Sequence, residues 1–219
     1  MPDLHTFYSG PMWHWLTRLG EAEVLLPVAL LTAAALFIRA DQRRLAGSWM
    51  LMLLVAATLT TASKVAFIGW GLGCAAINFT GISGHTMFST AIYPVLLVTL
   101  AGGSAPRGRR VALLAGCVLA LLIGWSRIAV GAHSWSEVVA GWLVGAAVTA
   151  WVLRLVKTHS IALRPLLPIV LLAWLALTSV SMPASQTHSM VTRLALQMSG
   201  HALPFTRSHM LRSAGQAPG

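Results

Sequence analysis

A short run near the middle of the chain carries four residues whose types and spacing could transfer a phosphoryl group. Ser126 and Arg127 are followed by His133, and Glu137 lies four residues after the histidine. The 219-residue chain has 15 Lys and Arg but only 5 Asp and Glu, and this run lies between strongly apolar stretches. Ionisable groups are costly to keep in such surroundings. The cluster therefore indicates a functional site.

The spacing of the histidine and the acid favours nucleophilic catalysis. One helical turn separates His133 from Glu137, so the carboxylate can hold one ring nitrogen and leave the other to attack. An earlier cluster, Ser83-Gly84-His85, adds a second histidine. We expect His85 to protonate a leaving alkoxide.

Charge on a phosphoryl group could be stabilised by a further set of donors. Lys64 and Arg127 supply cations, and Ser83 and Gly84 supply a hydroxyl and a backbone amide. Gly84 also lets the backbone approach a phosphate without an intervening side chain. Because these donors already neutralise the charge, and no metal-ligand spacing is found in the sequence, we expect neither a metal nor another cofactor.

The composition predicts an all-α, polytopic membrane protein. Hydrophobic residues make up 57% of the chain and charged residues 9%, with a mean hydropathy of +0.75, whereas a soluble domain carries about 25% charged residues. We expect an N-terminal interfacial segment (1–23), a transmembrane domain (24–181) and a C-terminal tail (182–219), amphipathic or disordered. Apolar runs near 20 residues long predict six membrane-spanning helices at 24–38, 49–72, 86–102, 111–130, 136–156 and 163–181.

The basic residues alternate along the chain, which predicts the topology. Every second connection is basic, namely 39–48, 103–110 and the region 154–164. The positive-inside rule then places these three in the cytoplasm, and both termini and the loops that carry the clusters outside, in the periplasm of a bacterial inner membrane. The same alternation argues against nucleic acid as the partner for the net charge of +10. The basic tail fits this assignment poorly, since Arg193, Arg207 and Arg212 would lie outside.

Counting along the predicted helices brings the candidate residues to one depth. Lys64 lies roughly 22 Å along the second segment and Arg127 roughly 24 Å along the fourth, both near the outer end. His85 begins the third segment, and His133 and Glu137 begin the fifth, at that same face. The predicted site is therefore shared by several helices at headgroup level.

These motifs resemble those of the type 2 phosphatidic acid phosphatase (PAP2) superfamily over roughly residues 20–156. The family motif P-S-G-H corresponds to Ile82-Ser83-Gly84-His85, and S-R-x5-H-x3-D corresponds to Ser126, Arg127, His133 and Glu137. The resemblance implies a PAP2-type bundle in which His133 forms a phosphohistidine, Glu137 orients it and His85 donates the proton. It also implies a set of phosphate-binding residues: Lys64, Ser83, Gly84, Ser126 and Arg127.

The chain departs from the family pattern in three places. The first motif, K-x6-R-P, survives only as Lys64, because Gly71 and Leu72 stand where arginine and proline are expected. Ile82 replaces the proline of the second motif, and Glu137 replaces an aspartate. The lost guanidinium would remove a bidentate phosphate contact. Weak activity, altered substrate choice and a cation recruited from elsewhere are the open alternatives. If the helix continued through Trp70, residue 71 would lie on the same side as Lys64.

The sequence thus favours a metal-independent membrane phosphatase that hydrolyses a lipid phosphate or diphosphate at the outer leaflet. Two alternatives stay open. A phosphotransferase would pass the phosphoryl group from His133 to an acceptor other than water. A non-catalytic member would use the pocket for lipid binding or transport. The sequence leaves the lipid and the oligomeric state undetermined.

Overall fold

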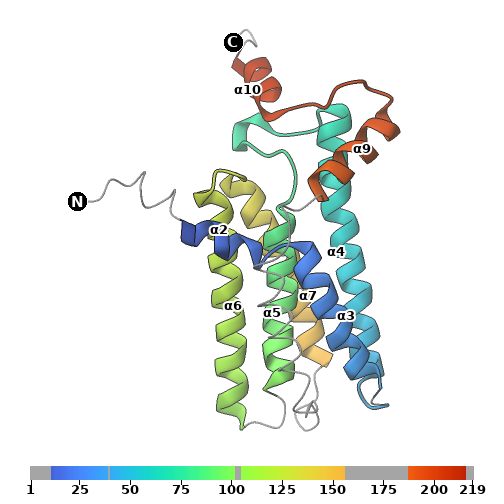
Figure 1. Cartoon of the computed structure of the whole chain (residues 1–219), viewed down its shortest axis with the longest axis vertical. Coiled ribbons are helices and arrows are strands. Elements are labelled where there is room, and N and C mark those ends of the chain that lie inside the picture. Colours follow the sequence, from blue (N-terminus) through green and yellow to red (C-terminus); the bar gives the residue numbers. More distant parts are fainter. Residues whose placement is uncertain (1–10, 39, 102–104, 156–186, 216–219) are drawn as a thin grey trace, which may run out of the picture.

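The protein is an all-helical bundle in the computed structural model, which describes residues 11–38, 40–101, 105–155 and 187–215 (Figure 1). Within these ranges the only strand-like pairing is an isolated bridge between Cys74 and Phe79. The helices are α2 (Pro11–Arg18), α3 (Ala22–Phe37), α4 (Arg43–Trp70), the 3-10 turn η1 (Ala75–Ile77), α5 (Gly84–Leu100), α6 (Pro106–Ala129), α7 (Trp135–Leu155), α9 (Thr187–Ser199) and α10 (Arg207–Gly215).

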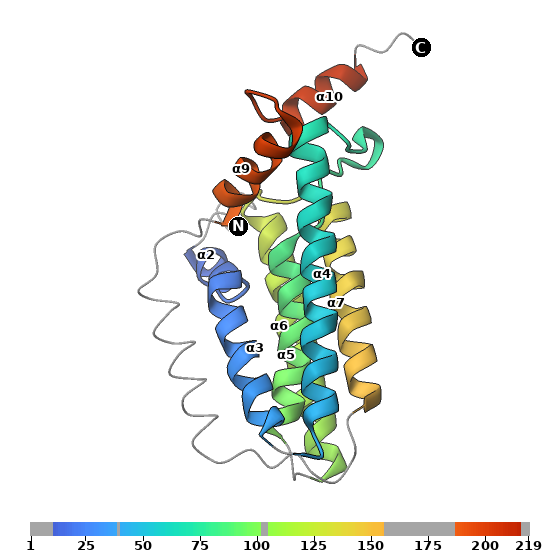
Figure 2. The same ribbon diagram turned by 90° about the vertical axis from the view of Figure 1, so that its right-hand side faces the viewer.

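Helix α5 forms the centre of the bundle and packs against α3, α4, α6 and α7. Figures 1 and 2 show α3 to α7 running along the long axis, with α9 and α10 at the upper end. Eleven of the 17 residues of α5 are buried, compared with five of 24 in α6. A helix that is apolar on all sides is suited to such a central place.

Two glycines of α7 bring it very close to the first turns of α5. A Cβ added to Gly141 would lie 2.8 Å from the carbonyl oxygen of Ser83, and one added to Gly145 would lie 2.6 Å from that of Met87. Small residues of this kind let the backbones of membrane helices approach each other. The first turns of α5 and the first half of α7 are therefore held together in the upper part of the bundle.

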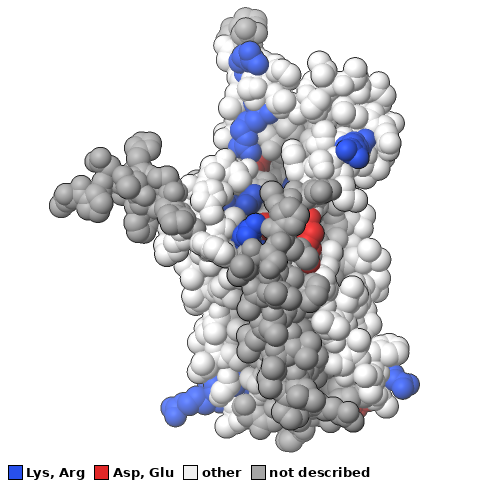
Figure 3. Space-filling model, viewed as in Figure 1, with Lys and Arg blue, Asp and Glu red and all other residues white. Residues whose placement is uncertain are grey.

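The bundle has the dimensions and surface of a multi-pass membrane protein. The helical stretches Ala40–Trp70, Pro106–Ala129 and Trp135–Leu155 are each long and apolar enough to cross a membrane, and the α2–α3 pair, bent by 42°, passes the same test as one span. Leu54, Leu114 and Leu143 expose 63%, 64% and 67% of their surface on the outside of the bundle. In Figure 3 the Lys and Arg residues on this face lie in the upper half and at the lower end, and the described surface between these two regions is uncharged.

Five of the six predicted segments correspond to helices, and the sixth, 163–181, lies outside the described residues. Helix α4 begins at Arg43, six residues before the predicted start at 49. Its first turns contain Arg43 and Arg44, which an apolar pattern cannot include. Helix α3 begins at Ala22, inside the segment 1–23 that was expected to be interfacial.

The two ends of the described chain both pack on the bundle. In α2, Trp13 is only 7% exposed and Trp15 is 51% exposed. In the tail, α9 places Val191 and Ala195 against an apolar cluster at the end of α4. The other face of α9 exposes Met190, Leu194 and Met198. Both terminal segments are thus positioned beside the upper end of the bundle.

Candidate active site

A cavity of about 660 Å³ lies at the upper end of the bundle and collects most of the candidate residues. Five of those predicted from the sequence line it: Lys64, Gly84, His85, Arg127 and His133. They come from the end of α4, the start of α5, the end of α6 and the loop before α7. The fold therefore joins residues that are up to 69 positions apart, from 64 to 133, in one cavity.

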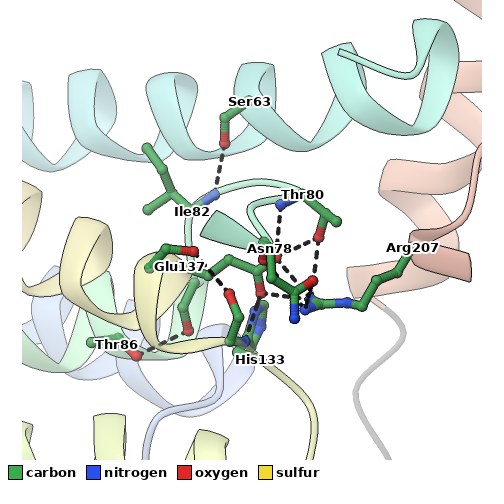
Figure 4. A network of polar contacts seen from close by, with 11 residues as sticks. Ser63, Asn78, Thr80, Ile82, Thr86, His133, Glu137 and Arg207 are labelled. Atoms are coloured by element: carbon green, nitrogen blue, oxygen red, sulfur yellow. Dashed lines mark hydrogen bonds and ion pairs between the residues drawn. The ribbon is translucent and has the colours of Figure 1, made fainter. Parts of the chain in front are cut away.

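His133 and Glu137 form a close pair at the wall of this cavity. The Nδ1 atom of His133 lies 2.7 Å from Oε2 of Glu137, one turn later (Figure 4). Because a carboxylate can only accept, Nδ1 carries the proton and donates it. The lone pair of the neutral ring is then on Nε2. This is the tautomer that a histidine nucleophile needs.

A tight turn after α6 ties His133 to Arg127. Gly131 adopts a positive φ of 68°, the left-handed conformation that glycine favours after a helix. The backbone N–H groups of Ala132 and His133 then both donate to the carbonyl oxygen of Arg127, at 3.0 and 3.2 Å. The candidate nucleophile and the candidate anion-binding guanidinium are thus fixed on the same turn of chain.

The carboxylate of Glu137 is fully buried and is satisfied on both oxygens. Thr80 donates its backbone N–H to Oε1 at 2.8 Å and its hydroxyl to the same atom, and Ser134 donates its N–H to Oε2 at 3.2 Å. A buried charge without such partners would be costly. Thr80 precedes the Ser-Gly-His cluster by only three residues, but no motif identified it.

The guanidinium of Arg127 is positioned by the N-terminal helix. Its Nη1 donates to Oγ1 of Thr17 in α2 at 2.6 Å. Among the described residues, its Nε is buried and has no hydrogen-bond partner. Arg127 lines the cavity, where its guanidinium could donate to an anionic oxygen.

Lys64 and Gly84 meet at the beginning of α5. A Cβ added to Gly84 would lie 4.0 Å from Nζ of Lys64 and would touch no backbone. Gly84 is the first residue of the helix. The first N–H groups of a helix have no intrahelical partners and favour an anion. The lysine and the helix end thus offer donors at one place.

The isoleucine that replaces the family proline has a specific use. The backbone N–H of Ile82 donates to Oγ of Ser63 at 3.0 Å, which ties the loop before α5 to the turn of α4 that carries Lys64 (Figure 4). Proline has no N–H and could not form this bond. This departure from the motif is therefore accompanied by a new contact.

Two predicted phosphate ligands, Ser83 and Ser126, are fully buried and are not among the described residues that line the cavity. Oγ of Ser83 accepts from the hydroxyl of Thr86 at 2.9 Å. Oγ of Ser126 donates to the carbonyl oxygen of Ile123, one turn earlier in α6, at 2.6 Å. Both serine hydroxyls thus form hydrogen bonds inside the protein. The spacing of residues in the sequence could not show these bonds. Their contact with a phosphate stays a prediction.

The surroundings of His133 keep its ring neutral. Burial lowers the pKa of His133, and the nearby cations Lys64 and Arg127 lower it further, against the hydrogen bond to Glu137, which raises it. The net shift is downward. A neutral ring at neutral pH is the reactive form of a nucleophilic histidine.

One cation in the cavity comes from a segment that no motif covered. Arg207, the first residue of α10, lines the cavity. Its Nη2 donates to Oε1 and Oε2 of Glu137 at 2.8 and 2.9 Å, and its Nη1 donates to Oδ1 of Asn78 at 2.9 Å. The sequence placed Arg207 only in the C-terminal tail. The structure adds it to the residues of the candidate site.

Comparison with known proteins agrees with this geometry. Residues 76–161 match the PAP2 superfamily. A Klebsiella pneumoniae protein described as an uncharacterized 22.5 kDa protein in the cps region is 34% identical over 213 residues, which cover 92% of this chain and 99% of that protein. The chain belongs to the PAP2 superfamily. No solved structure matches it.

Membership of the PAP2 superfamily indicates a phosphatase-type function. The matched region contains Ser83-Gly84-His85 and the run from Ser126 to Glu137, so both recognisable PAP2 motifs fall within it. Lys64 precedes this region and Arg207 follows it. These two cations line the cavity but lie outside the PAP2 match.

Proposed function

We propose that this PAP2 protein hydrolyses a lipid phosphate or diphosphate through a phosphohistidine on His133. One observation carries the proposal. The His133–Glu137 pair opens onto the same cavity as Lys64, His85 and Arg127. A nucleophile, a proton donor and two cations in one cavity are what phosphoryl transfer requires.

The reaction would proceed in two displacements. Nε2 of His133 attacks phosphorus, the bond to the leaving oxygen breaks, and His85 gives that oxygen a proton. Water then attacks the phosphohistidine, with His85 taking the proton, and phosphate leaves from His133. Lys64, Arg127 and the N–H groups at the start of α5 would hold the non-bridging oxygens in both steps.

A lipid substrate is favoured by the composition and position of the cavity. Its wall includes Phe67, Ile68, Phe88 and Phe205 beside the polar groups. It lies at the end of a bundle whose middle is apolar on the outside. A headgroup could bind at the cations while its acyl or prenyl chain stays in the bilayer. We place this end outside the inner membrane of a bacterium, because the opposite end carries Arg107, Arg109 and Arg110 at the start of α6.

Phosphate release by purified protein tests this function. The protein in detergent is incubated with phosphatidate, phosphatidylglycerophosphate and a polyprenyl diphosphate, alongside His133→Ala. We expect release from at least one lipid and none from the variant. Transfer to an added alcohol without free phosphate would instead identify a phosphotransferase. Tight lipid binding with no turnover would identify a non-catalytic member.

A further inference from the structure

The C-terminal segment fills the place where the first family motif would have continued. Helix α4 ends at Trp70, and Gly71 adopts a positive φ of 69° as its C-cap. A Cβ added to Gly71 would lie 3.0 Å from the ring of Phe205. Residue 71 therefore does not lie on the face of α4 that carries Lys64. It would lie there only if the helix had continued beyond Trp70. The tail occupies that space instead.

The tail is fixed on the end of α4 by specific contacts. The N–H of Phe205 donates to the carbonyl oxygen of Ile68 at 2.9 Å, and Nδ1 of His201 lies 2.7 Å from that of Gly69. Helix ends leave such carbonyls without intrahelical partners. The apolar cluster of α4 with Val191, Ala195 and Met210 adds packing on both sides. These contacts place α10 so that its first residue reaches the cavity.

Arg207 then completes the environment of Glu137. His133 approaches the carboxylate from one side, and Arg207 donates to both oxygens from another. Asn78 holds the other terminal nitrogen of the guanidinium. Glu137 is one methylene longer than the family aspartate, so its carboxylate has an additional torsion to fix. A guanidinium that contacts both oxygens fixes that torsion and also balances a fully buried charge.

We propose that the C-terminal segment is part of the active site and that Arg207 is a positioning residue, which holds the carboxylate of Glu137 for His133. This inference rests on the proposed function for its catalytic meaning. Arg207 thus does not take over phosphate binding from the arginine that the first motif lacks. A cation from the tail supports the nucleophile pair, while Lys64 and Arg127 are left for the phosphate.

A second consequence is electrostatic. Glu137 stabilises the protonated ring of His133, and a cation on the same carboxylate weakens that effect. Arg207 should therefore keep His133 neutral. The other titratable or charged groups around the cavity come from every side of it: Glu21, Lys64, His85, Arg127 and His188. All of these groups are kept in the Arg207 variants, so the titration of His133 is compared with the same set of neighbouring groups.

Arg207→Met, Arg207→Lys and the control Arg212→Met test this proposal. Arg212 is an exposed residue of the same helix whose Nε donates to the carbonyl oxygen of Ser208. We expect Arg207→Met to lower kcat roughly 10–100-fold, the range for groups that orient another ligand, with KM changed less than about threefold. Arg207→Lys should recover part of kcat, and Arg212→Met should match the wild type. A rise in KM at constant kcat would overturn the proposal in favour of direct substrate binding.

A double-mutant cycle sharpens the test. If Arg207 acts through Glu137, then Arg207→Met should have no further effect in a Glu137→Gln background. Equal losses in both backgrounds would contradict the proposal.

A readout without turnover separates this proposal from the proposed function. NMR of histidine-labelled protein follows the titration of His133 directly. We expect a higher pKa for His133 in Arg207→Met than in Arg212→Met. An unchanged titration would overturn the role of Arg207 even in an active enzyme. A shifted titration in a protein that releases no phosphate would leave Arg207 coupled to the pair and refute only the phosphatase function.

Discussion

Thr17 accepts a hydrogen bond of 2.6 Å from Nη1 of Arg127, although the two residues are 110 positions apart. This contact joins the N-terminal helix α2 to the end of α6. It fixes one terminal nitrogen of the guanidinium on protein and leaves the buried Nε without a partner among the described residues. The orientation of the candidate anion-binding group is therefore set by a segment outside the family motifs.

Thr17→Val should weaken catalysis without disturbing the bundle. A hydrogen bond to a charged group contributes about 1.5–3 kcal/mol, so kcat/KM should fall roughly 10–100-fold. Thr99→Val is a matched control, because the Thr99 hydroxyl donates only to Val95 within α5. Thr17→Ser should retain most of the activity. Equal losses in Thr17→Val and Thr99→Val would contradict a specific role for Thr17.

His85→Ala should discriminate between leaving groups. A general acid matters most when the leaving oxygen is a poor leaving group, and it contributes about 10²–10⁴-fold in such cases. We expect a large loss with an alkyl phosphate and a small one with a nitrophenyl phosphate, measured as phosphate released by the same enzyme samples. The same loss with both substrates would exclude His85 as the proton donor.

The pH profile should report the neutral ring of His133. Attack requires the unprotonated histidine, so kcat/KM should rise with pH through a pKa below the ordinary value near 6.5. Lys64 is one of the cations that lower this pKa. Lys64→Met should therefore move the acidic limb to higher pH and also lower the maximal rate by about 10²–10³. Arg110→Met, at the opposite end of the bundle, serves as the control. A limb that stays in place or moves to lower pH in Lys64→Met would contradict this assignment.

The native cysteines allow the topology to be measured. Cys74 is exposed between α4 and η1, and Cys117 lies half-buried in α6. In a Cys117→Ser background, a membrane-impermeant maleimide should label Cys74 in intact spheroplasts. With Cys74→Ser and Arg107→Cys, labelling should require lysis. The reverse pattern would place the cavity in the cytoplasm.

Much of this architecture could be predicted from the sequence, because apolar length and motif spacing are local properties. The segments that became α3 to α7 are marked by apolar runs, and the depth argument correctly brings Lys64, His85 and His133 to one end. The pairing of His133 with Glu137 follows from a separation of four residues, since His133 lies just before α7 and Glu137 lies in its first turn. In each case the signal lies within one helix or at its end.

The remaining contacts depend on tertiary packing, which spacing does not encode. Thr17 and Arg207 are ordinary polar residues in the sequence and gain their roles only because α2 and α10 dock at the cavity. The end of α4 at Gly71 was also not predicted from the sequence. A glycine in the left-handed conformation stops a helix that the apolar pattern would continue. Ser126 shows the opposite case, since it belongs to a family motif but donates to its own helix.

Trapping the covalent intermediate tests the central claim most directly. Protein in detergent is mixed briefly with substrate labelled at the transferred phosphorus and denatured under alkaline conditions, which preserve phosphohistidine. The account predicts a burst of protein-bound label located on His133, absent in His133→Ala and reduced in Glu137→Gln. Steady phosphate release with no bound label, or undiminished turnover by His133→Ala, would contradict it.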